Sequence, residues 1–277
     1  MCMNAAGDFA DRYGPWAFVA GASEGIGAAY ARRIAADGVN VVISSRRREV
    51  LEALADEIRA DTAAEVRVAP LDLTSPALVD DLERAVDDLE IGLLVYNAGA
   101  EIGFGRFAER PLGDALHLVD LSCRGPIILT HRLGGAMVAR GRGGIILMTS
   151  MAAGAGAAYN ATYGATKAFD RHLAEALWVE FGQSGVDVVA VVAGLTDTPA
   201  MRGLGMELTD DVPMMTSDEV AAEGLAALGR GPMWVTGELN RALAEGLWPG
   251  DRAPLALGMS AATATLYGFP APGAPGA

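Results

Sequence analysis

A serine, a tyrosine and a lysine stand at spacings that suit proton transfer. Tyr163 and Lys167 are four positions apart in the segment Tyr-Gly-Ala-Thr-Lys, and Ser150 lies thirteen positions before Tyr163. In a helix, positions i and i+4 share one face, so the ammonium would lie beside the phenol. A tyrosine with its ordinary pKa of about 10 is a poor base near neutrality. A neighbouring ammonium lowers that pKa because it favours the phenolate. These residues predict an acid/base site centred on Tyr163.

A second group of residues could hold phosphates. Gly21, Gly25 and Gly27 separate an apolar run, 16–20, from a helical pattern over 28–37. Glycines between a strand and a helix let the backbone approach a pyrophosphate, which then rests on the helix N-terminus. The spacing is Gly-x-x-x-Gly-x-Gly and not the commoner Gly-x-Gly-x-x-Gly. A structural turn would use similar glycines, so this loop by itself only indicates a dinucleotide site.

The end of the second apolar run bears on the choice of cofactor. NAD enzymes with a Rossmann-type sheet place a carboxylate there to accept from the ribose 2′-hydroxyl. This chain has Ser45, Arg46, Arg47 and Arg48 instead. A guanidinium binds a 2′-phosphate with two hydrogen bonds. We therefore predict NADP(H) in preference to NAD(H), with Arg46 as the main ligand and Ser45 and Ser23 as lesser donors. The alternative, a solvated start of an amphipathic helix, fits Arg48 best.

The elements that must position these groups alternate along the chain. Runs rich in Val, Ile and Leu predict strands at 16–20, 39–44, 66–70, 91–96, 144–149 and 186–192. Between them lie helical patterns, among them 47–60, with Val50, Leu51, Leu54 and Ile58 on one face, and 75–89, with Ser75 as N-cap. Uninterrupted apolar strands are typical of a parallel sheet covered on both faces. We predict an α/β fold, a single doubly wound Rossmann-type domain with a mostly parallel sheet, over residues 1–267.

Two segments fall outside this alternation. Residues 195–218 are rich in Gly, Met, Pro and Thr and follow a strand end, where open α/β sheets bind ligands. We expect a substrate loop there. Its methionines suit an irregular apolar surface, so a hydrophobic substrate such as a steroid or acyl chain is one interpretation and incidental Met the other; they are Met201, Met206, Met214 and Met215. Residues 268–277 are expected to form a flexible tail.

Taken in order from Trp16 to Arg230, these motifs resemble the short-chain dehydrogenases/reductases. The resemblance implies that Ser150, Tyr163 and Lys167 form a triad in which Ser150 binds the substrate oxygen and Lys167 also holds the nicotinamide ribose. It implies that Asp72 and Leu73 contact the adenine and that Asn97, Ala98 and Gly99 lie beside its ribose. The remaining cofactor contacts that it implies are Gly21, Ser23, Glu24, Gly25, Ile26, Gly27, Gly194, Thr196 and Thr198. Thr198 would alternatively, or also, cap a short helix that begins at Pro199.

The chain departs from the family pattern at three positions. Ala20 stands where Thr is usual and Ala193 where Pro is usual. Ser122 stands where the family has an Asn that supports a water between the catalytic lysine and solvent. A serine hydroxyl has one hydrogen-bonding group fewer. Our hypothesis is that Ser122 serves this catalytic position with an altered proton relay.

Composition excludes several other classes. The 277 residues carry a net charge of −14, which opposes nucleic-acid binding. Only Cys2 and Cys123 are present, so no disulfide framework is expected. No stretch reaches the about 18 apolar residues of a membrane span, and the N-terminus does not resemble a secretory signal, which predicts a cytoplasmic protein. The three histidines show no metal-ligand spacing and no metal is expected; they are His117, His131 and His172.

We thus predict an NADP(H)-dependent oxidoreductase that moves a hydride between nicotinamide and a carbonyl or secondary alcohol. Short similarities, among them residues 235–241, resemble branches that contain 3-oxoacyl-CoA and 17β-hydroxysteroid reductases. The family resemblance also implies a homodimer or homotetramer through helices at about 112–140 and 160–184. Two alternatives remain: a non-catalytic NADP(H)-binding sensor or scaffold, and an isomerase or dehydratase on the same fold.

Overall fold

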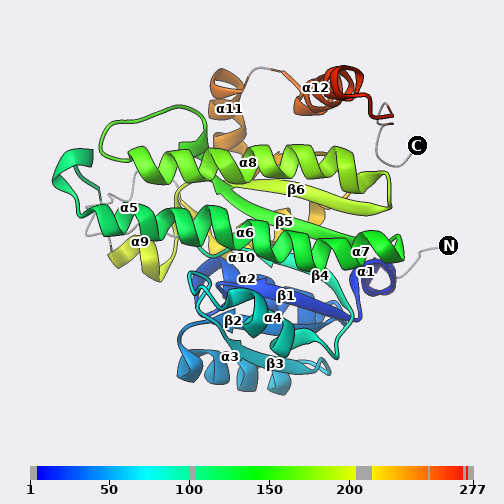
Figure 1. The fold of residues 1–277 in the computed structure, drawn as a ribbon. Coiled ribbons are helices and arrows are strands. Elements are labelled where there is room, and N and C mark those ends of the chain that lie inside the picture. The colour runs from blue at the N-terminus through cyan, green and yellow to red at the C-terminus, as the bar shows by residue number, and fades with distance from the viewer. Residues whose placement is uncertain (1–4, 100–103, 204–213, 249, 271–272, 274–277) are drawn as a thin grey trace.

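The protein folds around one seven-stranded sheet, seen in a computed structural model that describes residues 5–99, 104–203, 214–248, 250–270 and 273. All neighbouring strands of this sheet are parallel, in the order β3-β2-β1-β4-β5-β6-β9 (Figure 1). The strands are β1 (Trp16–Ala20), β2 (Asn40–Ser45), β3 (Val66–Pro70), β4 (Ile91–Tyr96), β5 (Gly143–Ser150), β6 (Val186–Ala193) and β9 (Met233–Val235). The predicted doubly wound α/β fold is confirmed.

Helices cover both faces of the sheet and bury one apolar core on each (Figure 1). One face packs against α2 (Gly25–Ala36), α3 (Arg48–Asp61) and α10 (Ser217–Ala226). The other packs against α4 (Leu78–Val86), α8 (Ala161–Gly182) and a long helix over residues 112–140. Because both faces are covered, every residue of β4 is buried.

The long helix contains two wider turns. Its α-helical parts are α5 (Leu112–Val119), α6 (Gly125–Leu129) and α7 (Gly135–Arg140), and π-helical turns at Asp120–Arg124 and Thr130–Gly134 join them. Such turns are uncommon and often lie at functional sites, because they displace side chains from regular α-helical spacing. The first of them contains Ser122.

The bounds of the six predicted strands agree closely with the structure, whereas two predicted details of the helices are wrong. Strands 16–20, 66–70 and 91–96 have the predicted bounds, and the other three differ by one residue at an end or at both ends. Ser75 does not cap α4, which begins at Leu78; its hydroxyl accepts from the Ala77 amide at 3.1 Å and closes the preceding turn instead. Val50 is exposed, because it precedes the inward stripe of α3 by one residue and so points about 100° away from it.

Residues 195–218 contain more regular structure than we expected. Two short strands, β7 (Thr196–Asp197) and β8 (Met215–Thr216), pair in parallel, and α9 (Pro199–Gly203) lies between them. The Thr198 hydroxyl accepts from the Met201 amide at 3.1 Å, as predicted for a helix cap. Thr216 and Glu219 form a capping box that starts α10. Met206 lies outside the described residues.

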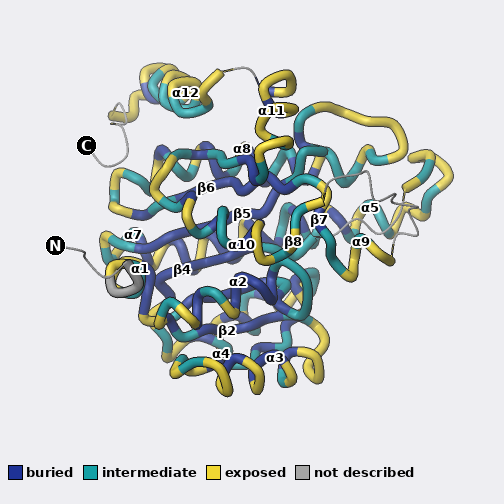
Figure 2. Tube along the Cα trace, turned by 180° about the vertical axis from the view of Figure 1, so that it is seen from behind, coloured by how far each residue is buried: buried dark blue, intermediate teal, exposed yellow. Residues whose placement is uncertain are grey.

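The C-terminal part adds α11 (Glu238–Leu247) and α12 (Arg252–Tyr267), which the sequence did not lead us to predict. Both lie at the periphery with exposed outer surfaces (Figure 2). Arg252 on α12 donates to both carboxylate oxygens of Glu175 on α8 at 2.9 Å, which ties the last helix to the domain. Gly268 ends α12 in the left-handed region; most of the tail predicted at 268–277 lies outside the described residues. One further helix, α1 (Ala5–Tyr13), precedes β1.

Candidate active site

The predicted site residues gather around one cavity of about 780 Å³. It opens at the carboxyl ends of the strands, beside β1 and β4, where the strand order reverses. Among the predicted residues, Gly27 and Ser122 do not line it. Those that do are Gly21, Ser23, Glu24, Gly25, Ile26, Ser45, Arg46, Asp72, Leu73, Asn97, Ala98, Gly99, Ser150, Tyr163, Lys167, Gly194, Thr196 and Thr198.

The glycine loop leaves no room for a side chain at Gly27. A Cβ on Gly27 would lie 2.0 Å from the Gly21 carbonyl oxygen and 2.7 Å from Asn97 Nδ2. Asn97 Nδ2 donates to the same carbonyl at 3.1 Å and so joins the end of β4 to the loop after β1. Gly21 and Gly25 have φ values of +79° and +57°, which other residues rarely adopt. The resulting cradle at the N-terminus of α2 fits a pyrophosphate.

Two arginines form a cationic corner at the end of β2. Arg46 and Arg47 both line the cavity. Arg47 donates to Ser23 Oγ at 2.8 Å and to Glu24 Oε2 at 2.6 Å, so its guanidinium is fixed on the glycine loop. The pKa of Asp72 is lowered, first by hydrogen bonds from Thr74 and further by the charge of Arg46. From the sequence, Arg47 was expected only to lie at the start of a helix, because no neighbouring residue reveals its contacts with residues 23 and 24.

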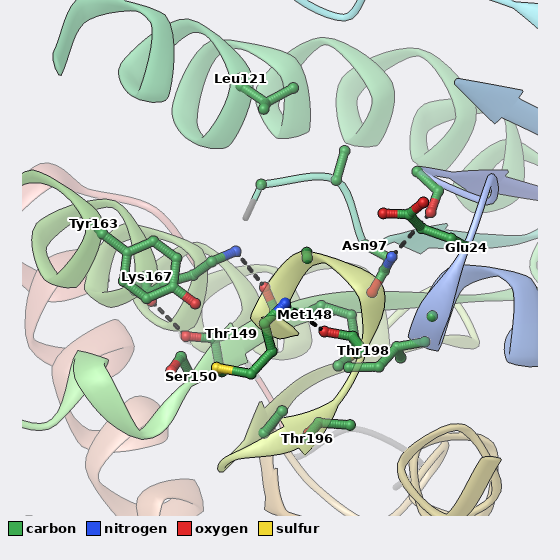
Figure 3. Close-up of a pocket in the computed structure, with 18 of the residues that line it drawn as sticks. Glu24, Asn97, Leu121, Met148, Thr149, Ser150, Tyr163, Lys167, Thr196 and Thr198 are labelled. Carbon is green, nitrogen blue, oxygen red and sulfur yellow. Dashed lines mark hydrogen bonds between the residues drawn. The ribbon is translucent and has the colours of Figure 1, made fainter. Parts of the chain in front are cut away.

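The acid/base residues occupy the opposite side of the pocket. Figure 3 shows Tyr163, Lys167 and Ser150 on one side and Glu24 and Asn97 on the other. Tyr163 and Lys167 share a face of α8, with Lys167 Nζ 6.0 Å from the centroid of the tyrosine ring. Ser150 ends β5 with an extended backbone, and its Oγ accepts from the Ala152 amide at 3.2 Å. The hydroxyl keeps its own proton for a further hydrogen bond.

Lys167 is held deep under this wall. Only 3% of the residue is exposed, and its Nζ donates to the Met148 carbonyl at 2.9 Å and to Asp170 Oδ2 at 3.1 Å. Asp170 is a residue that the sequence analysis did not single out. The available signal was a carboxylate three positions after the lysine on the inward face of α8.

Ser122 lies behind the cavity wall and not in it. Its side chain is fully buried, and its Oγ has no hydrogen-bond partner among the residues that the structure describes. A Cβ on Gly99 would lie 2.5 Å from Ser122 Oγ and 3.3 Å from Lys167 Nζ, so both atoms flank this glycine. The Tyr96 hydroxyl donates to the Leu121 carbonyl and so holds the π-helical turn that contains Ser122 against β4. The serine thus lies near the lysine.

The far end of the cavity is lined mainly by apolar side chains. Thr196 Oγ1 donates to the Gly194 carbonyl at 3.1 Å and shapes the segment after β6. Of the methionines expected there, Met201 lines the cavity, whereas Met214 and Met215 do not; Met215 packs against Gly237 and Asn240 at the start of α11. The apolar side chains of the lining include Phe104, Leu121, Met151, Leu195 and Met201.

The described residues offer neither a metal site nor a membrane-spanning helix. Within the described ranges, no cluster of His, Cys, Asp and Glu could hold a metal ion. Cys123 is a free thiol. None of the helices in the described part of the chain is long and apolar enough to cross a membrane.

Comparison with known proteins places the chain in a family. The model of the short chain dehydrogenase family matches residues 15–208. The chain belongs to the short-chain dehydrogenase family. It is therefore an oxidoreductase of a family that binds a nicotinamide cofactor, as its motifs predicted.

Its relatives include hydroxysteroid dehydrogenases. A 7beta-hydroxysteroid dehydrogenase of Clostridium sardiniense is 31% identical over 84% of this chain and 90% of its own length. The mouse (Mus musculus) 17-beta-hydroxysteroid dehydrogenase type 3 is 30% identical over 81% of this chain and 72% of its own. Very-long-chain 3-oxoacyl-CoA reductases are also among the relatives. These are the branches that the short similarities indicated.

Solved structures agree with this placement. A structure from a study of 7beta-hydroxysteroid dehydrogenase stereoselectivity has a TM-score of 0.80 and 27% identity, and covers 91% of this chain and 98% of its own. A short-chain dehydrogenase from Sphingobium yanoikuyae in complex with NADPH has a TM-score of 0.74 and 31% identity, over 84% and 92% of the two chains.

Proposed function

We propose that this protein transfers a hydride between NADP(H) and a carbonyl or secondary alcohol carbon of a hydrophobic molecule, with a hydroxysteroid as the leading class. One observation carries the proposal. The acid/base residues Ser150, Tyr163 and Lys167 line the same cavity as the cationic corner of Arg46 and Arg47, and Glu24, to which Arg47 donates, lies on the side opposite Tyr163 (Figure 3). The hydroxysteroid dehydrogenases among the relatives support the substrate class.

The residues present fit a dinucleotide phosphate. The bound cofactor would supply the hydride. The cradle of Gly21, Gly25 and Gly27 would receive the pyrophosphate, and the guanidinium groups of Arg46 and Arg47 would hold the 2′-phosphate. No carboxylate stands at the end of β2 to favour a free 2′-hydroxyl. At the other end, the third N–H of Lys167 remains for the nicotinamide ribose, because Met148 and Asp170 take the first two.

Proton transfer falls to Tyr163. In the direction of reduction its hydroxyl donates a proton to the substrate oxygen as the alkoxide forms, while Ser150 donates a hydrogen bond to the same oxygen. In oxidation the phenolate takes the proton back, and the nearby ammonium of Lys167 favours that phenolate.

The shape and lining of the cavity support a hydrophobic substrate. Beyond the polar wall, the side chains of Phe104, Leu195 and Met201 offer an apolar surface for a flat ring system or an acyl chain. A small hydrophilic ketone would leave that surface in contact with water.

A substrate panel with one variant tests the proposal. We expect purified protein to oxidise NADPH, followed by its absorbance, with steroid ketones, and more slowly with a small aliphatic ketone. An acyl thioester completes the panel. Tyr163→Phe removes the proton donor, so turnover should fall by at least about a hundredfold while NADPH affinity stays the same. Turnover retained in Tyr163→Phe would refute the role of this tyrosine. No turnover of any ketone by the wild-type protein, with NADPH bound, would favour a sensor or an isomerase.

A further inference from the structure

Asp170 is a buried carboxylate that the proposed reaction does not use. It follows Lys167 by three positions on α8, and with Tyr163 it completes a stripe at i, i+4 and i+7 along one helix face. Only 1% of the residue is exposed. Its Oδ2 accepts from Lys167 Nζ at 3.1 Å, and within the described part of the chain its Oδ1 has no hydrogen-bond partner. A charge buried this deeply is costly unless a partner offsets it, and the partner is Lys167.

The contacts of Lys167 place Asp170 directly behind its ammonium. An ammonium has three N–H donors. Two of them are used by the Met148 carbonyl and Asp170, both on the protein side. Gly99, after β4, lies close to the ammonium, since a Cβ there would lie 3.3 Å from Nζ. The ammonium therefore has little freedom to rotate, and its third donor faces the cavity that Lys167 lines.

Among the described groups that act on Lys167, Asp170 is the main charge. Burial raises the pKa of Cys123 on the neighbouring helix to about 11 and raises that of Tyr96 on β4 well above its ordinary value, so both stay neutral at physiological pH. Burial lowers the pKa of Lys167, but Asp170 and Tyr163 outweigh it and the net shift is upward. Burial also raises the pKa of Asp170, to about 6, because one cation offsets only part of its desolvation.

We propose that Asp170 is a positioning residue that fixes the ammonium of Lys167 and offsets part of its charge, and thereby sets the pH range in which Tyr163 exchanges its proton. This inference rests on the proposed function of Tyr163 and Lys167. Ser122 stands where the family has an Asn. Asp170, on α8, gives the lysine a polar contact on the side away from the cavity.

The direction of the effect follows from charge alone. An anion near a titrating group raises the pH at which that group loses its proton. Asp170→Asn removes the anion and keeps the size of the side chain. The titration of Lys167 and the pH midpoint of activity should therefore both move to lower pH. A carboxylate that served only packing would, when replaced by Asn, change stability and leave both midpoints in place.

A direct measurement is possible because Lys167 is the only lysine of the sequence. Protein grown with ¹³Cε-labelled lysine gives one NMR signal, which reports the charge of this ammonium without cofactor or substrate. In the wild type we expect it to titrate above the about 10.4 of a free lysine. In Asp170→Asn we expect it to titrate at lower pH than in the wild type. A wild-type titration at or below the free value, or no difference between the two proteins, would overturn the proposal.

Activity provides the second arm. In Asp170→Asn, the pH midpoint of kcat/KM for alcohol oxidation should fall by about one pH unit. Asp170→Glu should return it toward the wild-type value. Asp120→Asn is the matched control, since it makes the same change in the π-helical turn and Asp120 is not among the charges that act on Lys167. An equal shift in Asp120→Asn would contradict the proposal. If the wild type turns over no substrate, the proposed function fails, and the NMR titration still decides the pairing.

Discussion

In the proposed function, single guanidinium groups would set the preference for NADP(H). Arg46 and Arg47 both line the cavity, but only Arg47 is held by the glycine loop, through Ser23 and Glu24. A hydrogen bond to a charged group contributes about 1.5–3 kcal/mol. Arg47 also neutralises the carboxylate of Glu24, which would otherwise repel a phosphate.

Removing either arginine should therefore weaken NADPH binding selectively. We expect Arg46→Ala and Arg47→Ala to raise the Kd of NADPH by about tenfold or more, with the Kd of NADH almost unchanged. Arg48→Ala is the control, because Arg48 pairs with Glu52 on the surface of α3. Isothermal titration of the wild type and the three variants with both cofactors gives the dissociation constants that are needed. A wild-type protein that binds NADH as tightly as NADPH would show that the assignment to NADP(H) is wrong.

The grouping of Ser150, Tyr163 and Lys167 at one cavity could be predicted because their signal is local. One helix, α8, fixes the spacing of Tyr163 and Lys167, and Ser150 is the last residue of β5, the strand that precedes this helix. The contacts of Asp170 and Arg47 could not be predicted in this way. Asp170 is recognised only by its burial and by the hydrogen bond that it accepts from Lys167, and Arg47 only by its bond to a loop more than twenty residues away in sequence.

At the scale of elements, the same division appears between strands and helix ends. Buried β-branched runs define the strands well, because each must be apolar on both faces. Helix starts depend on competing turns, and Ser75 shows this by closing a turn two residues before α4 begins. The helix α12 could not be predicted from a buried apolar face, because it carries many exposed apolar residues. Its contact with α8 includes the ion pair of Arg252 with Glu175, which the local sequence does not reveal.

The packing of α10 against α2 supports the floor of the site. Tyr30 on α2 is fully buried, and its hydroxyl donates to Met148 Sδ at 3.4 Å. Met148 in turn holds Lys167 through its carbonyl. Gly224 on α10 makes room for this hydroxyl, because a Cβ there would lie 1.8 Å from it.

Gly224→Ala should therefore destabilise the fold. Overpacking of this kind costs about 1–3 kcal/mol, which corresponds to a fall in Tm of roughly 2–10 °C for a domain of this size. Gly258→Ala in α12 is the matched control, since no atom lies within 4 Å of its added Cβ. There the change should be neutral or stabilising, because Ala favours helix over Gly. Calorimetry of both variants measures the difference; equal Tm values in the two would contradict the close packing.

For the whole molecule, the outer surface of the long helix predicts self-association. Four large apolar side chains on it are between 43% and 70% exposed, and their spacing in the sequence places them along one side: Leu112, Leu116, Val119 and Ile127. Contiguous apolar surface of this kind marks protein interfaces. Each chain also carries a net charge of −14, so two copies repel each other at low ionic strength.

These two properties together give a prediction about salt. We expect light scattering after size exclusion to show two or four times 28.6 kDa, with the oligomer more stable at 0.5 M salt than at 20 mM, because screening removes the repulsion and leaves apolar contact unaffected. Ile127→Glu should give a monomer, since it places a charge in that contact. Leu239→Glu, at an equally exposed position on α11, should leave the mass unchanged. A wild-type monomer at both salt concentrations would mean that this helix faces solvent, and the four apolar side chains would then need another partner.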